Sequence, residues 1–146
     1  MFSKATEYAL RAAIYVAQKS SVEKKIGIAE IAGAIDSPVS FTAKILQSLT
    51  RNNNIISSSR GPNGGFFITE KAKKLSARRI LQAMGEDEVL EKCVLGLKKC
   101  SEVLPCPMHN QYKAIKLQLI KLFELTTIHD LAEGMHSGAA YIKNKK

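Results

Sequence analysis

The chain contains three cysteines, and all of them lie within fourteen positions, at Cys93, Cys100 and Cys106. Thiolates are preferred ligands of soft metals and of iron–sulfur clusters. Glycine and proline residues among the cysteines predict a loop that can fold around a single centre. Six and then five residues separate the cysteines, whereas structural zinc ribbons have paired two-residue gaps. The pattern predicts a metal, an iron–sulfur cluster or a redox thiol, with small buried apolar side chains as the alternative.

Three thiols cannot complete a four-thiolate site within one chain, so a fourth ligand would be His109, a carboxylate or a group from another subunit. His109 lies three residues after Cys106, close enough to join the same centre, although a lone histidine is more often a surface or capping residue. The chain shows no export-signal pattern, which argues against a disulfide framework. No apolar run approaches the roughly 20 residues needed to span a bilayer. We therefore expect a cytoplasmic protein that makes no membrane contact.

Residues 28–69 predict two short helices joined by a tight turn, followed by a two-stranded hairpin, which is the order of a winged helix-turn-helix. Ser37 and Pro38 predict the start of the second helix, with Ser37 as its cap. The three asparagines at 52–54 predict its end. Apolar residues recur at helical spacing in both helices: Ile28, Ile31, Ala32 and Ile35, then Phe41, Ile45, Leu46 and Leu49.

The polar face of the second helix carries Ser40, Lys44 and Gln47, which are side chains that can reach base edges and phosphates in a major groove. The hairpin is predicted from two apolar runs around the cluster at residues 60–65. Arg60 sits where it could enter a minor groove or hold a phosphate, and Asn63 lies at the same tip. These five residues form the predicted DNA-binding set. A generic small domain with a helix pair and a hairpin is the competing interpretation.

The charge distribution supports DNA binding by the first part of the chain. The net charge of +9 is uneven: residues 1–85 hold 13 Lys or Arg against 5 Asp or Glu, and residues 86–146 hold 9 against 8. A basic half that contains the helix-turn-helix is typical of a phosphate-binding surface. Lysines that only add solubility are the alternative.

Four more helices are predicted, over residues 2–19, 76–84, 108–125 and 127–133, with Gly85 ending the second of them. The first has apolar groups on more than one face, which predicts that it is sandwiched, with a partner subunit as one candidate for its second neighbour. The third has more apolar surface than a small lobe can bury, which predicts a dimer interface, with intramolecular core as the alternative. Arg78 and Arg79 could contact phosphates or form a solvated face.

These features predict a mainly α-helical chain with a small β-hairpin wing. We expect a winged helix-turn-helix over 1–85, a cysteine-bearing sensor loop over 86–107, and a dimerisation helix with a C-terminal tail over 108–146. The sequence shows no set of nucleophile, base and orienting group and no phosphate-binding glycine loop, so an enzyme is not expected.

The residues also resemble a known family over nearly the full length. The opening Thr6-Glu7-Tyr8-Ala9-Leu10-Arg11, the helix-turn-helix, the wing Arg60-Gly61-Pro62-Asn63-Gly64-Gly65-Phe66, the cysteines and the long following helix are similar to those of the bacterial Rrf-type winged-helix regulators. This family includes the iron–sulfur regulator IscR, the nitric-oxide sensor NsrR and the cysteine-metabolism regulator CymR. The resemblance implies a homodimer on dyad-symmetric operators of double-stranded DNA, with a 2Fe-2S or 4Fe-4S cluster that alters DNA affinity.

By resemblance, Cys93, Cys100 and Cys106 would hold the cluster. Either His109 or Glu7 would be the fourth ligand, and Glu7 would come from the other subunit. The first cysteine gap is one residue longer than in IscR, and Ala43 stands where an acidic base-reading residue can occur, so neither cluster type nor operator carries over. The alternatives are a cluster-free regulator that uses its cysteines as a thiol switch or zinc site, and one that responds to a protein partner.

Overall fold

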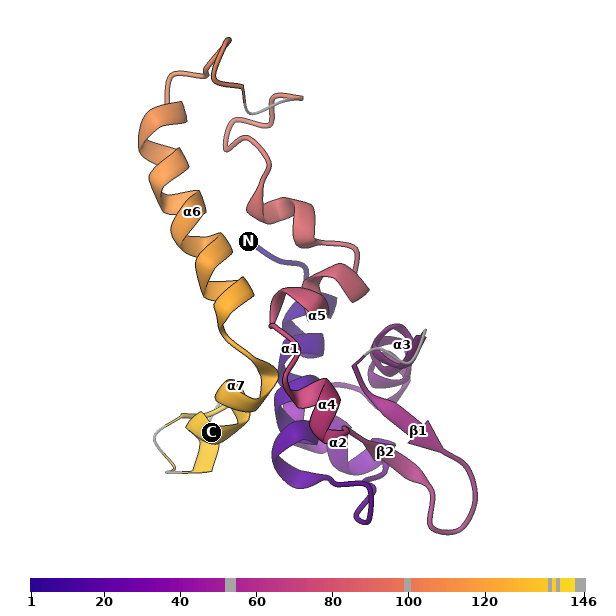
Figure 1. Ribbon diagram of the computed structural model, residues 1–146. Coiled ribbons are helices and arrows are strands. Elements are labelled where there is room, and N and C mark those ends of the chain that lie inside the picture. Colours follow the sequence, from indigo (N-terminus) through magenta and orange to yellow (C-terminus); the bar gives the residue numbers. More distant parts are fainter. Residues whose placement is uncertain (52–54, 99–100, 137, 139, 144–146) are drawn as a thin grey trace.

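The computed structural model describes residues 1–51, 55–98, 101–136, 138 and 140–143 of the 146-residue chain (Figure 1). It is mainly α-helical with one two-stranded sheet. The elements, in order, are α1 (Lys4–Lys19), α2 (Ile28–Ile35), α3 (Val39–Thr50), β1 (Ser57–Ser59), β2 (Gly65–Phe67), α4 (Glu70–Lys73), α5 (Arg78–Ala83), the 3₁₀ helix η2 (Asp87–Leu90), α6 (His109–Leu125) and α7 (Ile128–His136). In the described part of the chain, no helix is both long and apolar enough to cross a membrane.

Helix α1 lies at the centre of the molecule and packs against α2, α3, α5 and α7. Ala9, Ala12, Ala13 and Val16 are fully buried on it, and such small side chains let neighbouring helices approach closely. The prediction of a sandwiched helix is confirmed, but its second neighbour within the chain is α7. The helix begins at Lys4 rather than at residue 2, because the Ser3 Oγ accepts a hydrogen bond from the Thr6 N–H (3.2 Å) and caps it.

The helix-turn-helix has the predicted order, with one difference at the start of α3. Asp36 adopts a left-handed conformation (φ 57°) and ends α2. The Ser37 N–H still bonds to the Ala32 carbonyl (3.0 Å), so Ser37 belongs to the turn and does not cap α3. Pro38 takes the cap position, and its carbonyl accepts from the Thr42 Oγ1 (2.8 Å). Helix α3 ends at Thr50, and the asparagines expected to end it lie outside the described residues.

The wing pairs β1 with β2 in antiparallel register, with Ser58 opposite Phe66. An isolated bridge adds Ile26 beside Phe66, so the segment before α2 fastens the wing to the helices. Gly65 has φ 146°, and a Cβ there would lie 2.7 Å from the Ile26 carbonyl oxygen. Strand β1 begins only at Ser57, because the buried residues Ile55 and Ile56 precede it and pack into the core.

Two turns after the wing are set by local sequence. Gly85 ends the helix as predicted: its φ is 71°, its N–H bonds to the Gln82 carbonyl, and the Glu86 N–H bonds to the Leu81 carbonyl. Helix α7 begins with a reciprocal cap, in which Thr127 Oγ1 accepts from the Asp130 N–H and Asp130 accepts from the Thr127 N–H, each at 3.0 Å.

The cysteine-bearing segment leads away from the body of the molecule, and helix α6 returns alongside it (Figure 1). Its C-terminal end is fixed to the body, since the Ala77 N–H bonds to the Thr126 carbonyl (2.8 Å). Helix α7 then packs on α1, with Ile128 fully buried in the main core. This last helix is longer than the predicted 127–133, because its reciprocal cap and its packing on α1 stabilise it.

Candidate nucleic-acid interface and cysteine segment

Helix α3 has one face in the core and one face toward solvent. Thr42, Ile45, Leu46 and Leu49 are buried. Ser40, Lys44 and Gln47 are exposed, and Lys44 forms no ion pair with any other described residue. The predicted set on this helix therefore shares one accessible polar face. Such a face can enter a major groove and bond to base edges or phosphates.

Two residues of the opening motif hold α3 and α2 in place. The Tyr8 ring meets the Phe41 ring edge-on, with centroids 5.6 Å apart. The Arg11 guanidinium lies 5.3 Å from the centre of the Tyr8 ring and donates to the Ile35 carbonyl (3.3 Å) at the end of α2. The sequence analysis gave neither residue a role. The feature of the sequence that could have indicated this role is the spacing of the two residues, three positions apart on the helix that carries the core alanines.

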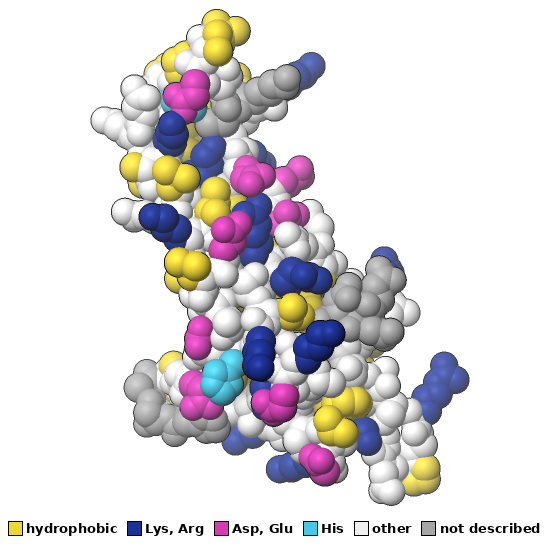
Figure 2. Space-filling view, in the orientation of Figure 1, with side chains coloured by type: hydrophobic (Ala, Val, Ile, Leu, Met, Phe, Trp, Pro, Cys, Tyr) yellow, Lys and Arg dark blue, Asp and Glu magenta, His cyan; other side chains and the backbone are white. Residues whose placement is uncertain are grey.

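The wing tip presents the other two predicted DNA-binding residues. Arg60 and Asn63 are both exposed, and Arg60 makes no ion pair within the described part of the chain. A bond from the Gly64 N–H to the Gly61 carbonyl (2.9 Å) closes the turn between the strands. Lys and Arg side chains project at the edge of the molecule where α3 and the wing lie (Figure 2). The five predicted residues are thus distributed over two adjacent exposed elements.

Arg78 does not belong to this set, although the sequence suggested phosphate contacts for it. Its guanidinium binds Glu124 (2.6 Å) and Glu91 (3.0 Å) and lies 4.0 Å from Asp87. The side chain is only 12% exposed. It is therefore committed to intramolecular carboxylates, whereas its neighbour Arg79 is exposed.

The Cys93 sulfur lies among backbone N–H groups. The N–H groups of Leu95 and Leu97 hold the pKa of the Cys93 thiol below its ordinary value; burial opposes them, and the Cys106 thiol and the Gly96 N–H add smaller contributions in the same direction. Cys93 is 3% exposed and Cys106 is half-buried. A concave set of amides of this kind stabilises anionic sulfur, as in many iron–sulfur sites. The structure thus brings two of the three predicted thiols together, and Cys100 lies outside the described residues.

The two candidates for a fourth ligand lie in different surroundings. His109 begins α6, is 5% exposed, and has its Nε2 3.4 Å from Glu102. Lys113, and less strongly His109, lower the pKa of Glu102. Glu7 lies on α1, half exposed, with its carboxylate 3.9 Å from the Lys4 Nζ. Among the described residues, no three His, Cys, Asp or Glu side chains converge on one point.

Comparison with known proteins identifies the family. A sequence model of the Rrf2 family, described as iron-dependent transcriptional regulators, matches residues 2–134. The chain belongs to the Rrf2 family. An inferred HTH-type transcriptional regulator of Aquifex aeolicus is 32% identical over 133 residues, which cover 90% of each chain. The regulator NsrR of Oceanobacillus iheyensis is 27% identical over 88% of this chain and 86% of its own.

A solved structure confirms the fold class. CymR, the global cysteine regulator of Bacillus subtilis, superposes with a TM-score of 0.74 at 21% identity, over 91% of this chain and 96% of CymR. The predicted resemblance and the winged-helix architecture are therefore both confirmed. Members of the Rrf2 family are transcriptional regulators and not enzymes. The protein is accordingly a DNA-binding transcriptional regulator.

The long helix of this Rrf2 protein leaves most of its apolar side chains uncovered. Its buried residues are His109 and Lys116. Ile115 and Leu122 are 54% and 56% exposed, and Leu125 at the end of the helix is 75% exposed. The apolar surface of α6 is therefore not used to form the core of a single chain.

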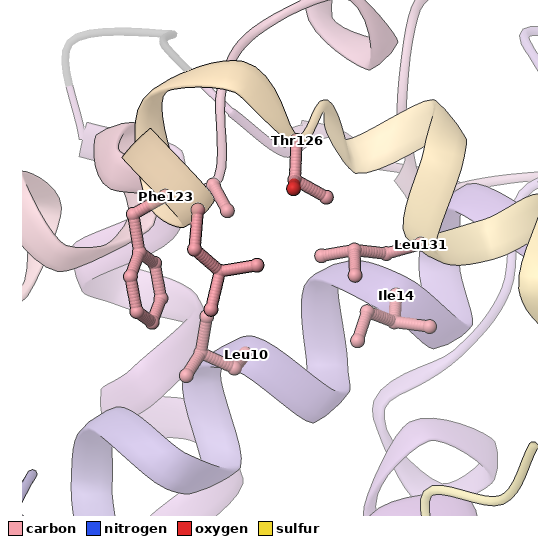
Figure 3. A pocket seen from close by; sticks show the side chains of 7 residues that line it. Leu10, Ile14, Phe123, Thr126 and Leu131 are labelled. Atoms are coloured by element: carbon pink, nitrogen blue, oxygen red, sulfur yellow. The ribbon is translucent and has the colours of Figure 1, made fainter. Parts of the chain in front are cut away.

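A small apolar pocket lies where α6 meets the body of the Rrf2 domain. It has a volume of about 210 Å³ and is open on one side. Leu10 and Ile14 of α1 face Phe123, Thr126 and Leu131 across it (Figure 3). The adjoining contact between the rings of Phe2 and Phe123, with centroids 5.5 Å apart, fixes the N-terminus against α6.

Proposed function

We propose that the protein is a homodimeric Rrf2 regulator that binds dyad-symmetric operators in the cytoplasm. Its DNA affinity would depend on a cysteine-ligated iron–sulfur cluster that senses iron–sulfur status, redox state or nitric oxide. Residues 1–85 would read DNA, residues 86–107 would sense the signal, and residues 108–146 would carry the dimerisation helix and the tail.

DNA reading is assigned to Ser40, Lys44 and Gln47 on α3 and to Arg60 and Asn63 on the wing. All five are exposed. In winged helices the second helix of the motif enters the major groove while a flanking element contacts the adjacent backbone or minor groove. Tyr8 and Phe41 would fix the angle of α3, because their ring contact joins it to the central helix.

Dimerisation is assigned to α6. Exposed apolar side chains at helical spacing are costly in water and are typical of helix-to-helix interfaces. Ile115 and Leu122 lie seven positions apart, which places them on the same face of the helix. Two copies joined through α6 would present two reading heads, as a dyad-symmetric operator requires.

The observation that carries the cluster proposal is the position of the Cys93 sulfur beside Cys106 and within a set of backbone N–H groups. The two thiols suit a soft metal centre, and the amides suit its negative charge. Cys93, Cys100 and Cys106 would hold a 2Fe-2S or 4Fe-4S cluster, with His109 or the partner's Glu7 as the fourth ligand. When bound, such a cluster supplies a redox-active and nitric-oxide-reactive centre.

Anaerobic purification followed by iron and acid-labile sulfide assays tests this proposal. We expect a coloured protein with iron and sulfide in near-equal amounts, and loss of both in Cys93→Ser. A colourless protein whose thiols all remain free after cluster reconstitution would remove the cluster from the proposal. It would leave DNA binding untouched, because none of the five DNA-binding residues belongs to the cysteine segment.

A second candidate function keeps DNA binding and removes the cluster. It is favoured by the contact between the Cys93 and Cys106 thiols and by the structural similarity to CymR, a cysteine regulator. Cys93 and Cys106 would then form a thiol switch, or with further ligands a zinc site, or the protein would respond to a protein partner. Metal analysis with thiol titration separates these cases: zinc without sulfide indicates the zinc site, and metal-free protein with reactive thiols indicates the switch.

A further inference from the structure

Arg78 joins three elements that are distant in the sequence. It is the first residue of α5, and its guanidinium binds Glu91, just after η2, and Glu124, on α6. Asp87 of η2 lies 4.0 Å away on the same side. These carboxylates hold the Arg78 charge so strongly that its pKa is raised above the ordinary value. One guanidinium thus ties α5, at the end of the DNA-binding domain, to the segment that leads into Cys93.

The short helix η2 is held from several other directions. The Glu86 carboxylate, immediately before it, accepts hydrogen bonds from the Ser3 N–H (3.2 Å) and the Thr6 Oγ1 (2.5 Å) at the start of α1. The Glu91 carbonyl, immediately after it, accepts from the Lys116 Nζ of α6 (2.9 Å). Leu90 is fully buried. Since Cys93 lies three residues further on, a displacement of the cysteine segment is opposed directly by these contacts.

We propose that Arg78 is the positioning residue that transmits the state of the cysteine segment to the DNA-binding domain. This inference rests on the proposed cysteine sensing. Arg78 acts through its carboxylate partners, by fixing η2 and α6 to α5. If the guanidinium is removed, Asp87, Glu91 and Glu124 lose the cation that they share, and the repulsion among their carboxylates loosens η2 from α6.

The ion pairs of Arg78 are partly exposed, so a variant that breaks them should still fold. The side chains of Glu91 and Glu124 are 62% and 51% exposed, so each single pair contributes little to overall stability. Loss of the Arg78 contacts should therefore affect the coupling between two sites more than the folding of either. Arg79, adjacent in the sequence, exposed and without an ion pair in the described chain, provides a matched control.

The experiment measures how cysteine modification changes DNA affinity in wild type, Arg78→Gln and Arg79→Gln. Each metal-free protein is titrated with a genomic DNA fragment selected by the wild type, once with free thiols and once after complete alkylation with iodoacetamide. A carbamidomethyl group cannot fit at the 3% exposed Cys93 without moving the segment. We expect wild type and Arg79→Gln to show an affinity ratio between the two forms of at least about fivefold, in the usual range of coupling between sites. In Arg78→Gln the ratio should fall below about twofold.

Two further variants keep the test decisive. Glu124→Gln removes the link to α6 from an exposed helix position, so it should fold even if Arg78→Gln does not, and it should also lower the ratio. Arg78→Lys keeps the charge but cannot bind several carboxylates at once, and should give an intermediate ratio. If Arg78→Gln and Glu124→Gln both keep the affinity ratio of the wild type, only the role of Arg78 is overturned. A wild-type ratio of one overturns the cysteine sensing and this inference together.

Discussion

Replacing Arg60 with alanine should weaken operator binding without weakening the fold. The side chain is exposed at the wing tip and makes no ion pair among the described residues. Substitutions at such positions usually change the free energy of unfolding by less than about 0.5 kcal/mol. A change in DNA affinity will therefore report the loss of a contact with DNA and not a disturbed wing.

The size of the effect follows from counterion release. Each phosphate neutralised by a protein cation contributes about 0.9 to the slope of log affinity against log salt concentration. A dimer presents two copies of Arg60, so loss of one phosphate contact per subunit should lower the slope by about 1.8. Between about 50 and about 200 mM salt, the penalty caused by the substitution should then shrink about tenfold.

Fluorescence anisotropy titrations of a selected genomic fragment, at several salt concentrations, measure this slope. Arg60→Lys is the matched control, because it keeps the positive charge and should keep the slope while losing the planar donor geometry of arginine. Thermal melts of both variants establish that the fold is intact. If Arg60→Ala binds with the wild-type slope, the wing does not contact phosphate through this residue and the reasoning is wrong.

Three other predictions concern the wing, the start of α1 and α6. Gly65→Ala should lower the melting temperature and operator affinity, because the new Cβ would lie 2.7 Å from the Ile26 carbonyl oxygen; unchanged values for both would contradict the wing geometry. Hydrogen bonds from Ser3 and Thr6 lower the pKa of Glu86 from its ordinary value of 4.5. The contribution of Glu86 to the free energy of unfolding is therefore present above pH 4.5 and is lost as the pH falls through the lowered pKa. Denaturant unfolding below pH 4.5 should accordingly be less pH-dependent in Glu86→Gln than in wild type, and equal acid sensitivity would rule this out. Ile115→Lys, at a position 54% exposed in the single chain, should leave a folded monomer in sedimentation velocity, and a persistent dimer would exclude this face as the interface.

Local signals allowed much of the fold to be predicted. The buried positions of α2 and α3, the wing turn, the stop at Gly85 and the bounds of α6 all follow from helical spacing, glycine conformation and caps. The errors are also local: Ser37 was expected to cap α3, but its N–H remains bonded within the preceding turn. The sequence could not show which residue would satisfy that N–H.

The parts that could not be predicted depend on contacts between distant positions. Arg78 meets Glu91 and Glu124, which are 13 and 46 positions away, and nothing in that spacing indicates a meeting. The amides around Cys93 depend on the path of residues 95–97 and not on their side chains. The ring contact between Tyr8 and Phe41 likewise requires knowing how α1 crosses α3.

The attachment of the last turn of α6 to the body has a mechanical consequence. The helix has 17 residues, and its last turn is fixed to the body through the bond between Ala77 and Thr126. At about 1.5 Å per residue, its opposite end lies about 25 Å from that pivot. A shift of about 1 Å beside the cysteines therefore turns the whole rod by only about 2°. A displacement at the tip of the helix thus becomes a small angular adjustment at its base, which would suit the proposed dimer, since its two reading heads would have to stay close to the spacing of one DNA turn.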